Sequence, residues 1–403
     1  MSNERQLRAA LGGVVFVAAL AVAAFGIYPH PSFSSDGYTY AVRMLVDRGL
    51  PLEDAVHRAQ EFWQQQPIAT DPLQAHLFRG DRAPLYWDVF KPRVIYPFLA
   101  AMLYPLRGFY GMLDISAFAY GGAALAIYYL ALQFAGALPS LAVTLGFMLY
   151  PGTLENARAT QTDMLAMFFS TLCIVALVRI ARGGDRRWIV TLAAACLLLV
   201  FTRPAFYMIL GGALGLAIGS RGGAPALRRA SLVCVGIAAA WAGLYIAVSL
   251  GMGTPSFSYV VADARDVFFR TQPELAQQSA LSRLKNAGLH FSPDDPLAVW
   301  YGKMVVNLVL RETIRGILFA FPLLGTVGLW VFRRDPAFGP LVGVMAGGSL
   351  VLLLDQWSQD MTRVLEVPML PVIAVGLLGA ASALYGRLFV PNEHSFENRL
   401  RRR

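Results

Sequence analysis

The stretch Ala230–Leu250, ASLVCVGIAAAWAGLYIAVSL, runs for 21 residues without a charged side chain. About 20 apolar residues in an α-helix are enough to cross the hydrocarbon core of a bilayer. Further uncharged apolar runs are Leu11–Tyr28, Ile115–Leu138, Leu165–Leu177, Trp188–Phe201, Gly316–Phe332, Gly339–Leu354 and Val367–Leu384. Together these runs predict an all-α polytopic membrane protein.

The composition excludes a set of soluble domains. The chain of 403 residues is 56% hydrophobic and only 15% charged, and its mean hydropathy is +0.52. Soluble domains carry about 25% charged residues. The charged residues of this chain are also clustered between the apolar runs rather than spread along the sequence.

The net charge of +9 would suggest a nucleic-acid partner if the protein were soluble. Here the arginines stand in short loops at alternate ends of successive apolar runs, as the positive-inside rule requires. These loops and the tail contain Arg179, Arg182, Arg186, Arg187, Arg221, Arg228, Arg229, Arg333, Arg334, Arg399, Arg401, Arg402 and Arg403. We therefore expect membrane lipids as partners and no nucleic acid.

The arginine positions also predict a topology. Residues 1–403 form a single transmembrane domain of about ten helices, with both termini in the cytoplasm. Two long segments, 29–108 and 251–305, then lie on the outer (periplasmic) side. Both contain amphipathic or aromatic stretches that suit helices on the membrane surface. Arginine greatly outnumbers lysine in the chain, which favours a bacterial inner membrane.

The stretch 36–66 of the first outer segment has a helical pattern. Its apolar residues recur at spacings of three and four, and the pattern is broken at Gly49–Pro51. It therefore predicts two short amphipathic helices.

Asp36 follows the first apolar run by about eight residues, in the sequence Ser34-Ser35-Asp36-Gly37-Tyr38. A carboxylate just outside a membrane span is placed to meet the reactive phosphate of a lipid-linked substrate. The same residue types also suit the N-terminal cap of the helix that follows. Both interpretations stay open on the sequence alone.

Asp163 ends an unusually polar hairpin, residues 155–163, between two apolar runs. Polar groups at a membrane boundary tend to be paired or functional. Asp163 is therefore either a catalytic carboxylate or a helix cap paired with Arg158.

Four cations lie at outer boundaries, where the topology does not explain them. Lys91 and Arg93 flank Pro92, Arg203 stands between two apolar runs, and Arg363 precedes the last run. Such cations suit a phosphate group, although an arginine can also extend its side chain to the interface without binding a ligand. Tyr38, Tyr96 and Arg158 belong to the same motifs and are expected to contact substrate.

Signatures of soluble enzymes and metal sites are missing from the sequence. There is no phosphate-binding P-loop, no G-x-S-x-G and no H-E-x-x-H, and the five histidines are scattered. We expect neither a bound metal nor a cofactor.

The order of these motifs resembles the GT-C superfamily of membrane glycosyltransferases, whose relatives include protein O-mannosyltransferases and lipid A aminoarabinose transferases. The likeness rests on Asp36-Gly37-Tyr38, Lys91–Pro97, Asn156–Phe169, Thr202–Pro204 and the segment from Arg363 to Pro371. It covers roughly residues 9–220 and 355–385. The chain departs from the superfamily in lacking extra spans, a soluble C-terminal domain and a D-x-D-like pair.

The resemblance implies an inverting transferase that uses a polyprenyl-phosphate-linked sugar as donor at the outer face of the membrane. Asp36 is then the catalytic base, and Asp163 matches the acidic position after the polar hairpin. The acceptor is a hydroxyl of a lipid, glycan or protein. Two alternatives remain: a transporter or flippase for a lipid-linked or amphipathic substrate, and a non-catalytic assembly partner with the same fold.

Overall fold

The computed structural model describes residues 2–33, 35–66, 90–203, 205–254, 291–292, 294–314, 325, 327–354 and 361–385. Across these residues the fold is all-helical, as the sequence predicts, and the one β-type pairing is an isolated bridge between Ser32 and Ala159. The first half of the chain contains α1 (Ser2–Val22), the π-helical turn η1 (Ala23–Ile27), α2 (Ser35–Asp47), α3 (Leu52–Gln64), α6 (Ile95–Arg107), α7 (Tyr110–Ala131), α8 (Ala137–Leu149), α9 (Pro151–Arg158) and α10 (Asp163–Ala181). The second half contains α11 (Arg186–Thr202), α12 (Phe206–Gly219), α13 (Pro225–Gly251), α17 (Leu297–Ile314), the 3-10 turn η2 (Trp330–Phe332), α19 (Phe338–Leu354) and α20 (Met361–Tyr385).

Four helices in the described residues are long and apolar enough to cross a membrane: Glu4–Ile27, Tyr110–Ala131, Asp163–Ala181 and Pro225–Gly251. The pair α8 and α9 adds a fifth if the two count as one broken span. Others, including α12, are shorter apolar helices. The structure therefore supports membrane-spanning helices but not the predicted number of ten.

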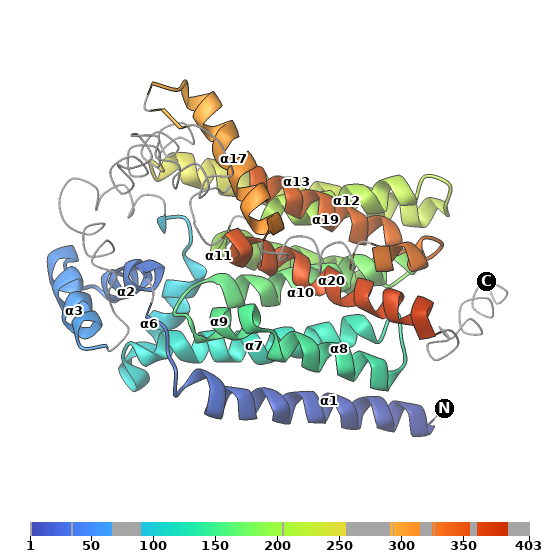
Figure 1. Ribbon diagram of the computed structural model, residues 1–403, viewed down its shortest axis with the longest axis horizontal. Helices are drawn as coiled ribbons and strands as arrows, with labels where there is room; N and C mark the ends of the chain where they lie inside the picture. Colours follow the sequence, from blue (N-terminus) through green and yellow to red (C-terminus); the bar gives the residue numbers. More distant parts are fainter. Residues whose placement is uncertain are drawn as a thin grey trace.

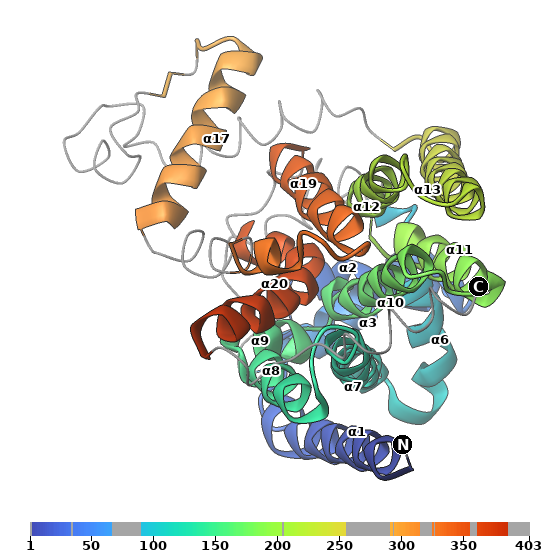
Figure 2. The same ribbon diagram turned by 90° about the vertical axis from the view of Figure 1, so that its right-hand side faces the viewer.

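The long helices run side by side as a bundle, with α1 at one side and α12, α13 and α19 at the other (Figures 1 and 2). The short helices α2, α3 and α6 gather at one end of this bundle, next to α9 (Figure 1). The two helices predicted in 36–66 are confirmed as α2 and α3. They separate where predicted, because Gly49 has a φ of 91° that favours glycine and Pro51 precedes α3.

The opposite end of the bundle contains the arginine-rich turns that follow α10, α12 and η2. Arg182, which follows α10, forms an ion pair with Asp335 in the turn before α19. Arg179 donates a hydrogen bond of 3.0 Å to the side chain of Gln133, which follows α7. Helix α1 also begins at this end and α20 ends there (Figure 1). We call it the arginine-rich end.

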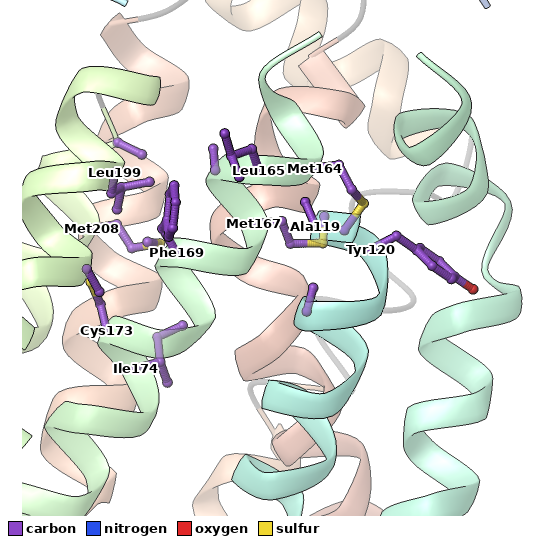
Figure 3. Close-up of a cluster of buried hydrophobic side chains, with 14 of the residues drawn as sticks. Ala119, Tyr120, Met164, Leu165, Met167, Phe169, Cys173, Ile174, Leu199 and Met208 are labelled. Atoms are coloured by element: carbon purple, nitrogen blue, oxygen red, sulfur yellow. The ribbon is translucent and has the colours of Figure 1, made fainter. Parts of the chain in front are cut away.

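Helix α10 forms the centre of the bundle. It carries apolar side chains on all of its faces, which is typical of a fully buried helix. Met164 and Met167 point toward Ala119 on α7, while Cys173 lies on the side of Leu199 of α11 (Figure 3). Because α10 packs against helices on several sides, its first residue, Asp163, is held firmly in place.

Helices α8 and α9 follow each other directly but do not form one continuous helix. Tyr150 adopts an extended conformation (ψ 129°) before Pro151, and α8 and α9 meet at an angle of 57°. A residue before proline disfavours the helical conformation, which explains the break. The short helix α9 then leads directly into the polar hairpin.

Helices α12 and α19 approach each other at two rows of glycines. Gly211 and Gly215 of α12 face Gly343 and Gly339 of α19, and a Cβ atom at any of the four would collide with main-chain atoms of the facing helix. Small residues at intervals of four let helix backbones pack closely.

Replacing Gly343 by alanine should destabilise the protein. The added Cβ meets the carbonyl oxygen of Gly211, and overpacking of this kind costs about 1–3 kcal/mol. Thermal unfolding of the detergent-solubilised protein measures the effect. Gly236→Ala is the matched control, because Gly236 also lies in a helix but has open space at its Cβ position. Equal melting temperatures for the two variants would contradict the close packing.

Candidate functional site

The site is formed where the chain leaves the first long helix and meets the polar hairpin. The Ser32 N–H donates to the Arg158 carbonyl at 2.9 Å, and the Thr160 N–H donates to the Ser32 carbonyl at 3.1 Å. These bonds satisfy main-chain groups that would otherwise lack partners in two irregular segments. They bring the segment around Asp36 beside the segment around Asp163.

Gly37 allows α2 to lie directly on the hairpin. A Cβ atom at this position would collide with the hydroxyl of Thr160 and lie 2.7 Å from its carbonyl oxygen. Glycine is therefore required by the close approach. This contact gives a physical reason for the Gly in the motif Asp36-Gly37-Tyr38.

Asp36 occupies the first turn of α2 and is half-buried. A carboxylate in the first turn interacts favourably with the helix dipole. Tyr40 stands one turn later on the same face, and its hydroxyl lies 3.2 Å from the hydroxyl of Thr162. Asp36 is therefore on the side of α2 that faces the hairpin.

Arg93 reaches the same place from the turn before α6. Its Nη1 donates to the Tyr40 hydroxyl at 3.2 Å, and its guanidinium carbon lies 4.6 Å from the centre of the Phe90 ring. Lys91, two residues earlier, is half-buried like Arg93. The structure thus brings Arg93 into contact with a tyrosine that stands one helical turn from Asp36, and both Arg93 and Asp36 are predicted site residues.

Asp163 and Arg203 form a buried ion pair. Asp163 has an exposed fraction of 0% and Arg203 of 7%, and they join the first residue of α10 to the residue that ends α11. Because Arg203 is paired and almost fully buried, it is poorly placed to be a separate ligand for a donor phosphate. The pair holds two helix ends together at the edge of the site.

The predicted pairing of Asp163 with Arg158 is wrong, because Arg203 takes that position. The Nε of Arg158 instead donates to the carbonyl oxygen of Gly26 at 2.8 Å, inside the π-helical turn η1. Gly26 stands next to the last residue of η1, and the last carbonyl groups of a helix have no partner within it. Arg158 therefore fastens the hairpin to the end of α1.

The two predicted tyrosines have packing roles. Tyr38 is buried, donates to the Val56 carbonyl at 3.2 Å and lies against the Trp63 ring, and burial raises the pKa of its phenol. Tyr96 has no exposed surface and donates to the Met112 carbonyl at 3.0 Å. Neither hydroxyl is therefore oriented toward an incoming substrate.

The remaining predicted residue, Arg363, belongs to the first turn of α20. Its side chain lies outside the described part of the structure. Helix α20 packs against α10 and α9, which carry the hairpin.

Sequence reasoning missed Tyr40 and Thr162. In the sequence Tyr40 is one position of the helical pattern in 36–66, and nothing there indicates that its hydroxyl contacts two distant segments. The hairpin itself has a signal, because its polar residues are numerous. Within it, the side chains of Asn156, Thr160, Gln161 and Thr162 are all buried.

Among the described residues, no three His, Cys, Asp or Glu side chains are grouped closely enough to hold a metal ion. The site therefore consists of one accessible carboxylate, two cations and a set of hydroxyl and amide groups. Such a site suits proton transfer and the binding of an anionic group.

No protein-family model matches the chain, and no curated protein matches its sequence. The resemblance to the GT-C superfamily therefore stays a prediction from the motif order.

Asp163→Asn should destabilise the protein by about 3–5 kcal/mol, because it leaves the buried Arg203 charge without its partner. The double variant Asp163→Asn/Arg203→Met should recover part of this loss, since no buried charge remains. Chemical unfolding in detergent measures the free energies. In the exposed pair Asp185–Arg187, whose atoms lie 2.7 Å apart, Asp185→Asn should cost at most about 1 kcal/mol. A double variant no more stable than Asp163→Asn would contradict the pairing.

Proposed function

We propose that this protein is a membrane glycosyltransferase. It transfers a sugar from a polyprenyl-phosphate-linked donor to a hydroxyl of a lipid, glycan or protein acceptor at the outer face of the membrane. One observation carries the proposal: half-buried Asp36 stands one helical turn from Tyr40, which holds the guanidinium of Arg93. The proposed base, Asp36, and the proposed phosphate-binding cation, Arg93, are therefore both positioned by Tyr40 and the helix that carries it.

In this reaction Asp36 accepts the proton of the acceptor hydroxyl. The hydroxyl oxygen forms a bond to the anomeric carbon of the sugar, and the bond from that carbon to the phosphate oxygen breaks. Direct displacement inverts the anomeric configuration. The electron pair leaves with the lipid phosphate, and Arg93 and Lys91 stabilise its charge by charge-assisted hydrogen bonds.

Asp163 and Arg203 have a different part in this proposal from the one that the motif order suggests. Because they are paired and buried, they fix the N-terminal end of α10 and the C-terminal end of α11. The hairpin that contacts α2 is attached to α10. The pair therefore keeps the floor of the site in position and leaves the chemistry to Asp36.

The position of the charges favours surface chemistry over transport. Transporters place ionisable residues near the middle of their spans. In the four span-length helices that the structure describes, charged residues stand close to the helix ends, as at Asp114, Asp163, Arg179 and Arg228. The site residues likewise lie at one end of the bundle.

The proposed orientation places the arginine-rich end in the cytoplasm and the site on the opposite, periplasmic side of a bacterial inner membrane. The distribution of arginine supports it, because basic residues are retained on the cytoplasmic side. About ten spans, with both termini inside, complete this proposal.

Asp36→Asn should abolish most of the sugar transfer. A positioned general base contributes about 10²–10⁴ in rate, so the turnover number should fall by this factor. Transfer from a panel of radiolabelled polyprenyl-phosphate monosaccharides, with the purified protein in liposomes, measures it. Asp47→Asn is the matched control: Asp47 ends the same helix and pairs with Arg43 at 2.8 Å, away from the hairpin.

Two results would contradict the catalytic assignment. One is transfer by Asp36→Asn at the wild-type rate. The other is movement of a labelled lipid-linked sugar across the bilayer without any transfer, which would identify a flippase instead.

The orientation is tested with introduced cysteines. The three native cysteines are buried, so the background labelling by a membrane-impermeant maleimide should be low. In intact spheroplasts, Glu61→Cys in exposed α3 should react, and Gly222→Cys in the turn between α12 and α13 should react only after permeabilisation. The reverse pattern would invert the proposed topology.

A further inference from the structure

We propose that Tyr40 is a positioning residue that holds Arg93 against the phosphate of the lipid-linked donor. This inference rests on the proposed function and adds a residue that the motif order does not contain.

The direction of the hydrogen bonds supports this role. A guanidinium can only donate, so the bond of 3.2 Å from Arg93 Nη1 uses the Tyr40 oxygen as acceptor. The Tyr40 hydrogen is then available for the Thr162 hydroxyl, also at 3.2 Å. Arg93, Tyr40 and Thr162 are thus linked by two consecutive hydrogen bonds.

The Tyr40 ring is fixed, so its hydroxyl cannot move away from Arg93. The residue has an exposed fraction of 1%. Its ring makes edge contacts with Phe90 at 5.1 Å and with Tyr96 at 5.4 Å between centres. Phe90 also lies under the Arg93 guanidinium, so the ring and the hydroxyl restrict the cation together.

The hydrogen bond between Tyr40 and Thr162 links Tyr40 to the buried ion pair. Thr162 directly precedes Asp163, which is bound to Arg203. Tyr40 is therefore anchored on the rigid end of α10 rather than on a free loop. Asp36, one turn earlier on α2, is held by the same contact, so the base and the cation keep a constant separation.

A rigid cation binds a phosphate better than a mobile one, because less side-chain entropy is lost on binding. Tyr40→Phe keeps the ring and its packing but removes the hydroxyl. Arg93 then still carries its charge but must be ordered by the ligand. The variant should weaken binding without abolishing it.

The test is equilibrium binding of radiolabelled undecaprenyl phosphate to the purified full-length protein in nanodiscs. Tyr40→Phe should raise the Kd on the order of tenfold, as expected for one hydrogen bond to a charged group. Thr162→Val, which removes the other partner of the hydroxyl, should weaken binding in the same direction. Melting temperatures close to that of the wild type verify that each variant is folded.

A double-mutant cycle separates positioning from a general effect on structure. Arg93→Gln should also weaken binding, and adding Tyr40→Phe to it should have no further effect, because Tyr40 acts through Arg93. Tyr120→Phe is the matched control. The Tyr120 hydroxyl is also buried and donates to the Met148 carbonyl of α8 at 2.9 Å, but the side chain points away from α10 (Figure 3), so the Kd should stay unchanged.

The outcomes distinguish this inference from the proposed function. If the wild type binds undecaprenyl phosphate and Tyr40→Phe binds equally well, the positioning role is wrong and the proposed function stands. Additive losses in the double variant would overturn the action through Arg93. If the wild type does not bind the lipid phosphate, the proposed function fails and this inference fails with it.

Discussion

Two main-chain hydrogen bonds between Ser32 and the turn at Arg158–Thr160 join the beginning of the first outer segment to the polar hairpin. Both segments are irregular, so their main-chain groups need partners, and each segment supplies the partners of the other. The close approach of Gly37 to Thr160 follows from this pairing. Without it, Asp36 and the hairpin would have no fixed relation, although 126 positions separate Asp36 from Thr162 in the numbering of the chain.

The hairpin is in turn held by the rigid part of the bundle. Helix α10 is enclosed by α7, α11, α12 and α20, so its first turn moves little relative to them. The buried Asp163–Arg203 pair adds α11 to this end. A buried pair brings little net stability compared with apolar side chains of the same size, but the loss of one partner is costly. The pair is therefore better understood as a device that fixes position than as a source of stability.

The sequence was sufficient to predict several of the helices. Uncharged apolar runs predict the helices α7, α10 and α13, because the length and polarity of such a run are local properties. The break between α2 and α3 is also local, since Gly49 and Pro51 determine it. The glycine rows of α12 and α19 are equally visible in the sequence, at intervals of four residues, but only the structure shows that the two rows face each other.

The sequence by itself determined an all-helical chain with span-length apolar helices, and it singled out the carboxylates and cations at helix ends. The tertiary structure decided how these charges are used. It pairs Asp163 with Arg203 instead of Arg158. Arg158 donates a hydrogen bond to the carbonyl of Gly26. Half-buried Asp36 stands one helical turn from Tyr40, which accepts a hydrogen bond from Arg93. The physical reason is that an arginine side chain can reach any of several acceptors. Which acceptor it meets depends on how distant helices pack, and the local sequence does not encode that.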